Sequence, residues 1–213
     1  MENKKYLNDL SEIREMMSRS SRFISLSGLA GVFAGIYAII GAVIAKMLLS
    51  DYGSNYENVY NSFDITTEDT ELRTNLILIA IVVLVLAIST AIFLTTRKAK
   101  KNNQKIWDST SKRLVTNFFG PLSAGGLFCL VLLQYELVGL IAPAMLLFYG
   151  MALVNASKYT FNDLRSLGYA NVIIGLIATQ FIGYGLYFWA LGFGVFHIIY
   201  GVVMYNKYER KQA

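Results

Sequence analysis

Four residues near the C-terminus have side chains suited to proton or solute chemistry. His197 is the single histidine of the chain, and imidazole is the side chain that ordinarily titrates near neutral pH. With a turn near Ala190, Gln180 and Tyr200 each lie ten residues from the turn and therefore at the same depth. Gln180 and Tyr184 are spaced i, i+4, and His197 and Tyr200 are spaced i, i+3, so each pair shares a helix face. The spacing predicts a polar seam between two helices.

The sequence leaves two interpretations of this seam open. An ionisable side chain inside a membrane is costly, which makes His197 a candidate site for a solute or a proton. A neutral histidine bonded to a tyrosine would instead lock the two helices together. One histidine cannot form a histidine-rich metal site, and the one cysteine, Cys129, excludes an internal disulfide and a cysteine-based metal cluster. We therefore expect no metal and no cofactor.

The sequence contains no recognisable enzyme motif. It has no P-loop, no HExxH and no GxSxG, and no predicted span contains a pair of carboxylates. We therefore expect no catalytic residue. Two charged groups beside predicted spans are candidates for an outer mouth, Glu136 in a predicted turn and Lys46 near the end of the first span. Glu136 is either solvated or part of a cation path, and Lys46 is expected to extend to the surface, where it could pair with Glu136.

Long apolar helices must position these residues. The chain of 213 residues is 55% hydrophobic and 15% charged, whereas about a quarter of the residues of a soluble domain are charged. Because about 20 apolar helical residues cross the hydrocarbon core, we predict an all-α membrane protein. The transmembrane domain at 23–206 is expected to contain six helices in three hairpins, at about 23–49, 75–96, 114–134, 137–155, 169–188 and 191–206.

The distribution of charge predicts an orientation. Segment 97–113 has seven positive charges and one negative, 7 − 1 = +6, whereas loop 50–73 has one positive and six negative, 1 − 6 = −5. Because Lys and Arg next to spans remain on the cytoplasmic side, we expect the acidic loop outside and both termini, including a tail at 207–213, in the cytoplasm. Segment Arg97–Arg113 is also expected to contact anionic lipid headgroups. With Trp107 as its only aromatic residue, it does not indicate nucleic-acid binding.

Residues 1–22 are predicted to form a cytoplasmic amphipathic helix. In "NDLSEIREMMSRSSRF" (8–23), Leu10, Ile13 and Met17 form an apolar stripe, which suits a helix lying on a membrane surface. A plain cytoplasmic extension of the first span is the alternative. From this stretch through Gly31, the chain resembles the start of some uncharacterised bacterial inner-membrane proteins. That resemblance covers mainly the N-terminal third, contains no diagnostic motif and implies no function, but agrees with a bacterial inner membrane as the location.

Small residues predict close helix packing. Ser27, Gly31 and Gly35 form a ridge with i, i+4 spacing on the first span, which either packs inside the bundle or mediates homodimerisation. A sequence echo also appears at an offset of 51 residues, where "FYGMALVNASKY" (148–159) matches "IYGVVMYNKY" (199–208). It is either a duplicated hairpin or a coincidence of composition.

Two functions remain open. The first is a non-enzymatic integral membrane protein that acts through self-association or through a protein or lipid partner. The second is a small transporter or channel for a solute, an ion or a proton, with its path along the predicted seam. A water-accessible cavity at the seam would favour transport, whereas a dry, hydrogen-bonded interface would favour the first function.

Overall fold

The chain folds into long helices. The computed structural model describes residues 26–51, 70–102 and 106–210, and the regular structure in these ranges is entirely helical. Five of the described helices are long and apolar enough to cross a membrane. The predicted all-α class is therefore confirmed, together with several helices of membrane-spanning length. The predicted amphipathic helix at 1–22 lies outside the described residues.

Helix boundaries follow the apolar runs. The first three helices are α2 (Gly28–Asp51), α4 (Thr70–Lys101) and α5 (Ser109–Gln134). A short 3₁₀ turn precedes α6 and another follows it, giving η2 (Val138–Leu140), α6 (Ile141–Ala156) and η3 (Ser157–Tyr159). The chain then continues through α7 (Asp163–Ala178) into a last helix, which we call the C-terminal helix, made of α8 (Gly185–Trp189), η4 (Ala190–Val195), α9 (Phe196–Met204) and η5 (Tyr205–Glu209).

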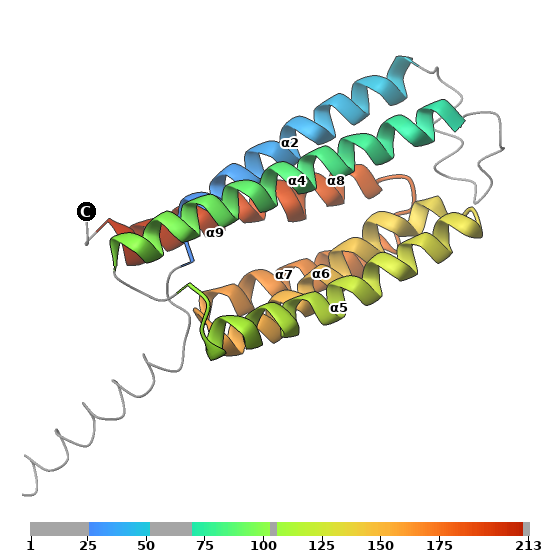
Figure 1. Cartoon of the computed structure of the whole chain (residues 1–213). Helices are drawn as coiled ribbons and strands as arrows, with labels where there is room; N and C mark the ends of the chain where they lie inside the picture. Colours follow the sequence, from blue (N-terminus) through green and yellow to red (C-terminus); the bar gives the residue numbers. More distant parts are fainter. Residues whose placement is uncertain (1–25, 52–69, 103–105, 211–213) are drawn as a thin grey trace, which may run out of the picture.

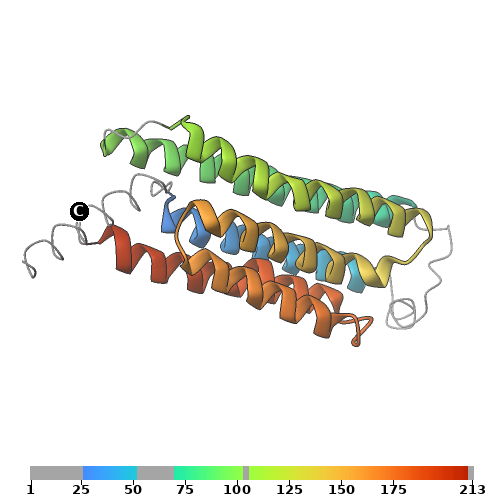
Figure 2. The ribbon, with the colours of Figure 1, turned by 90° about the horizontal axis from the view of Figure 1, so that it is seen from below.

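The long helices that the structure describes form two groups of three. α2 packs against α4 and the C-terminal helix, while α6 packs against α5 and α7. Figure 1 shows these groups one above the other, and they meet where the C-terminal helix contacts α6 and α7. Figure 2 shows α4 and α5 in one outer layer, α2 and α6 in the middle, and α7 with the C-terminal helix in a third. The centre of the bundle therefore lies between α2 and α6 of the middle layer and the helices of the third layer.

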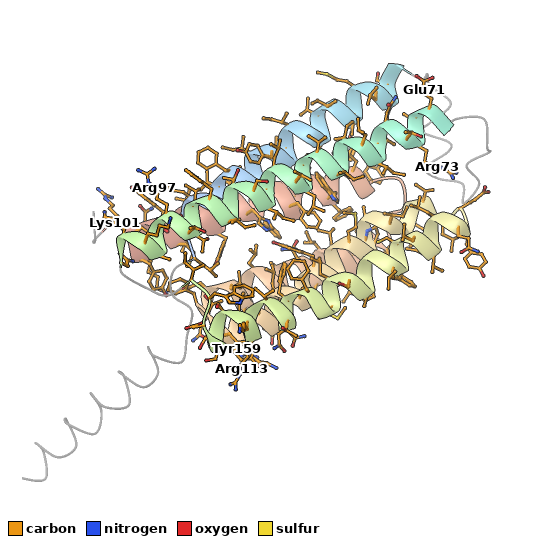
Figure 3. The ribbon with its side chains drawn as sticks, viewed as in Figure 1. Glu71, Arg73, Arg97, Lys101, Arg113 and Tyr159 are labelled. Atoms are coloured by element: carbon orange, nitrogen blue, oxygen red, sulfur yellow. The ribbon has the colours of Figure 1, made fainter. Side chains whose placement is uncertain are left out.

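Charged side chains distinguish the two ends of the bundle. Figure 3 shows Arg97, Lys101 and Arg113 at one end, which we call the basic end, and Glu71 and Arg73 at the other, which we call the opposite end. The described cations of segment 97–113 thus gather at one end of the bundle.

Glycines set the distance between α2 and the C-terminal helix. A Cβ atom on Gly201 would lie 2.5 Å from the Val32 nitrogen and 2.6 Å from the Gly28 oxygen. One on Gly35 would lie 2.6 Å from the Gly194 oxygen. The two backbones are therefore in direct contact, as small residues permit when helices pack in a membrane. Gly31 and Gly35 of the predicted ridge both lie in this crossing.

A second close crossing joins α6 to α7. A Cβ atom on Gly150 would lie 2.6 Å from the Gly168 oxygen, and one on Gly168 would lie 2.8 Å from the Gly150 oxygen. Both Tyr-Gly pairs of the sequence echo, at 149–150 and 200–201, thus place their glycine where a neighbouring backbone touches the helix. The two copies of the sequence echo therefore have the same packing role.

The predicted boundary between the last two spans was wrong. The chain turns at 179–184, where Gly183 has a φ of 100°, and not near Ala190. The C-terminal helix runs without a break for 25 residues from Gly185, so the predicted tail at 207–213 begins inside it. The physical reason is packing: two glycines beside the predicted turn lie at helix contacts, Gly192 against Leu146 and Gly194 against Ile39.

Candidate functional site

His197 lies in the centre of the bundle with both ring nitrogens engaged. Its Nδ1 is 2.9 Å from the Gly192 carbonyl oxygen, and its Nε2 is 2.6 Å from the Tyr149 hydroxyl oxygen. Because a carbonyl only accepts, Nδ1 carries the proton and donates to Gly192, while Nε2 accepts from the tyrosine. The arrangement therefore suits a neutral imidazole, and only 7% of the residue is exposed.

A widened helical turn supplies one partner of this histidine. Ala190–Val195 is π-helical, and Gly192 precedes His197 by five residues. The Gly192 carbonyl thus accepts from a side chain of its own helix. Single π-helical turns are rare inside α-helices and occur frequently at functional sites, so this segment marks the centre of the candidate site.

Aromatic rings enclose the histidine. The rings of Phe193 and His197 stack with centroids 6.1 Å apart, and the Tyr149 ring lies 4.9 Å from Phe193. Tyr149 and Tyr200 also pack against a buried cluster that includes Leu153. These contacts cover part of the Tyr149–His197 hydrogen bond, which is partly buried.

Asn171 of α7 looked from the sequence like a capping or loop-facing amide, and the structure places it inside the bundle instead. It is completely buried, and its Nδ2 donates to the Leu167 carbonyl at 2.9 Å. Its Oδ1 is the one buried side-chain polar atom without a hydrogen-bond partner in the part of the chain that the structure describes. That oxygen faces the π-helical segment, 2.7 Å from the position that a Cβ atom on Gly192 would take. The sequence feature that could have identified Asn171 is its amide side chain in the middle of an apolar helix.

The predicted polar seam is not assembled. Gln180 and Tyr184 lie in the turn before the C-terminal helix, whereas His197 and Tyr200 lie on α9. The Gln180 amide donates to the Thr179 hydroxyl at 3.1 Å and is exposed, as is Tyr184. The partner of His197 comes from α6 instead. The seam depended on a turn near Ala190, so moving that turn to 179–184 separates the four residues.

The two candidate mouth residues do not pair in the structure. Glu136 lies in the turn after α5 with a φ of 60°. The ammonium of Lys46 lies over the Tyr187 ring, 5.2 Å from its centroid, which is within the range of a cation–π interaction. Neither residue belongs to the ion pairs found among the described residues, Lys98–Glu209 and Lys207–Asp163.

A first group of polar contacts at the basic end, which we call the first clasp, joins the start of α2 and the end of α4 to the end of the C-terminal helix. The Lys98 ammonium lies 3.1 Å from Glu209 Oε1 and donates to the Leu26 carbonyl at 2.7 Å. Glu209 also accepts from the Gly28 amide and from the Ser27 hydroxyl. The carboxylate therefore caps α2, where the positive end of the helix dipole favours a negative charge. Ser27 of the predicted ridge contributes to this cap.

A second clasp joins α7 to the C-terminal helix. Asp163 accepts from Lys207 Nζ at 3.0 Å and from the Tyr208 hydroxyl at 2.7 Å. Partial burial raises the pKa of the Asp163 carboxyl, but the bonds from Tyr208 and Lys207, together with the lysine charge, outweigh this and hold the pKa below its usual value. The Phe161 ring lies against Tyr208, with centroids 4.3 Å apart.

The described residues contain no group of three or more His, Cys, Asp or Glu side chains that could hold a metal ion. Comparison of the chain with protein-family models, with curated proteins and with solved structures finds no match. The functional argument therefore depends on the geometry of this chain.

Proposed function

We propose that this chain is a non-enzymatic integral membrane protein that acts by binding lipid, another protein or a second copy. The five helices of membrane-spanning length support the membrane assignment, and α7 with the following turn would supply a sixth span. The gathering of cations at one end supports a cytoplasmic position for that end. The N-terminal resemblance agrees with the inner membrane of a bacterium.

The hydrogen bond between Tyr149 and His197 carries this proposal. His197 is the group with the chemistry to carry a proton or to bind a solute, and both of its nitrogens are used by protein groups. A carrier site needs a lone pair or a proton that faces water or substrate. A buried, satisfied histidine instead holds helices together, because a polar group in hydrocarbon must find its partners inside the protein.

Binding would use the outer layer of the bundle. Gly28, Gly31 and Gly35 of α2 are covered by the C-terminal helix and Gly41 is covered by α4, so they are unavailable to a second copy. By contrast, the most apolar part of α4 contains no buried residue, and Leu127 and Leu130 of α5 are more than 60% exposed. These faces would meet lipid or a partner helix.

Thiol accessibility tests this function. Single cysteines replace Phe193 and Tyr200 beside His197 in a Cys129→Ser background, and each variant is treated with a membrane-impermeant thiol reagent in intact cells and in inverted vesicles. We expect no reaction from either side, because the histidine is enclosed by rings. Tyr135→Cys and Gln180→Cys are the matched controls, since both positions are exposed in turns, and they should react.

Labelling at position 193 or 200 with the controls behaving as expected would contradict the proposal. It would reveal a hydrated path to His197 and favour a transporter.

A further inference from the structure

The three carboxylates that the structure describes at the basic end are all engaged inside the protein. Asp108 accepts from the Ser111 amide at 2.7 Å as the cap of α5. Asp163 binds Lys207 and Tyr208, and Glu209 binds Lys98 and caps α2. Since the other described carboxylates, Glu71 and Glu136, belong to the opposite end, no acidic side chain described at the basic end remains free to neutralise another cation.

Eight exposed cations at this end belong to no ion pair within the described ranges. Three of them, Lys158, Arg165 and Arg210, lie on or beside α6, α7 and the C-terminal helix. We call the other five the basic rim: Arg97, Lys100 and Lys101 of α4, and Lys112 and Arg113 of α5. No described carboxylate compensates the charge of the basic rim, which is complementary to an anionic partner.

The helix dipole explains the positions of only some cations of the basic rim. Lys100 and Lys101 lie in the last turn of α4, where the negative end of the helix dipole favours cations. Lys112 and Arg113 lie close to the first turn of α5, at the positive end of a helix, where the dipole disfavours them. Their position is therefore better explained by an anion outside the chain.

Exposed aromatic rings continue from these cations toward the middle of the bundle. Phe93 precedes Arg97 by one helical turn, and Phe119 follows Lys112 by two turns, with exposed fractions of 64% and 47%. Trp107, between the two helices, is 64% exposed, as is typical of residues at the level of lipid headgroups. Along both α4 and α5, cations at the end of the bundle are followed by an exposed phenylalanine deeper in, which matches the order of phosphate and acyl chain in a phospholipid.

We propose that the basic rim binds anionic phospholipid, with the phosphate against the cations and the acyl chains along Phe93 and Phe119. This proposal rests on the proposed function as a membrane protein and names its partner. An acidic protein would match the charge alone. The exposed phenylalanines deeper along the same helices favour a ligand that is both anionic and apolar.

Quenching by brominated lipid tests the proposal on the full chain. Trp107→Phe and Trp189→Phe remove both tryptophans, and Phe119→Trp places a reporter beside the proposed acyl chain. The protein is reconstituted with phosphatidylglycerol or phosphatidylcholine brominated near the headgroup, each diluted into unbrominated phosphatidylcholine. We expect phosphatidylglycerol to be preferred by at least about fivefold, which is roughly the contribution of one cation near a membrane surface. High salt should weaken this preference.

Variants that lack cations of the basic rim test whether the preference for phosphatidylglycerol arises at the rim. Lys112→Gln with Arg113→Gln should lower the preference for phosphatidylglycerol severalfold, since two of the five cations of the basic rim are removed. Arg73→Gln is the matched control, since it removes a cation from the opposite end of α4, and it should leave the ratio unchanged. Circular dichroism of each reconstituted variant checks that it is folded.

Equal quenching by the two lipids in the otherwise unaltered reporter protein would overturn the lipid proposal without any need for a charge variant. An acidic protein surface would then be the partner that the cations fit. A preference that is unchanged in the doubly neutralised variant would equally contradict the basic rim as the site. Neither result bears on the accessibility of His197, so failure here is distinguishable from failure of the proposed function.

Discussion

The hydroxyl oxygen of Tyr149 on α6 lies 2.6 Å from Nε2 of His197 on α9. This bond joins the two three-helix groups of the bundle at a buried point. It is also the contact that determines whether the histidine is available for chemistry, because the other ring nitrogen is already bonded within its own helix.

Tyr149→Phe should destabilise the protein. The change removes the donor and leaves the histidine nitrogen buried without a partner, at a cost of about 1 kcal/mol, since side-chain hydrogen bonds between helices in membranes average somewhat less and reach about 1.7 kcal/mol. Unfolding in mixed micelles with increasing denaturing detergent measures the free energy. Tyr205→Phe, which removes no hydrogen bond found in the structure, is the control, and equal stability of the two variants would contradict a structural role for the bond.

Gly201→Ala should be strongly destabilising. The added Cβ would meet the backbone of α2 at 2.5 Å, and forcing a side chain into such a contact costs about 1–3 kcal/mol or more. Gly126→Ala is the matched control, because nothing lies within 4 Å of the corresponding Cβ position. There the higher helix propensity of alanine should be neutral or stabilising by up to about 1 kcal/mol. The same unfolding assay should order the variants in this way, and a harmless Gly201→Ala would mean that the crossing is looser than described.

Glu209→Gln should loosen the start of α2. The substitution keeps the shape of the side chain but removes the charge that binds Lys98 and caps Gly28, and we expect a loss of about 1–3 kcal/mol because both partners are largely buried. Hydrogen–deuterium exchange should become faster in peptides from the first turns of α2 and remain unchanged in α6. Uniform acceleration across all helices would instead indicate general destabilisation.

Asp163→Asn should remove an acid-sensitive contribution to stability. The folded-state pKa of this carboxyl is held below its usual value, which is about 3.9. Its contribution is therefore fully present above that usual value and is lost as the pH falls through the depressed one. Thermal unfolding of the wild-type protein and the variant between pH 7 and pH 3 measures the difference. The two stabilities should converge at the acid end, and a constant difference over the whole range would be inconsistent with this linkage.

Local sequence pattern predicted the helices better than it predicted their contacts. The apolar runs that became α2 and α4 are bounded by charge, so their existence could be read directly. Residues 169–206 contain glycine in several places and little charge, so hydropathy did not identify which glycine ends a helix. Gly183 takes a positive φ and forms the turn, whereas Gly192 is held in a π-helix by its neighbours.

The prediction of the site depended on knowing which glycine ends the helix. Because the candidate seam assumed the wrong turn, it joined His197 to Tyr184 rather than to Tyr149, which is 48 residues away along the chain. The clasp between Lys98 and Glu209 spans 111 residues, and no periodicity within a single helix could predict it. Contacts of this range depend on how helices pack, and helix packing is encoded by the small residues at each crossing rather than by any local motif.

The clasp at Glu209 has a consequence for biosynthesis. The amide of Gly28 is bonded to a carboxylate 181 residues later in the chain, and Gly28, Gly31 and Gly35 are covered by that same late helix. Because α2 is synthesised well before the C-terminal helix, its closest-packing face stays bare until that helix is in place. The cap of α2 and the glycine crossing can therefore form only after the C-terminal helix has been translated, and the correct partner must then reach a face that other apolar segments could contact in the meantime.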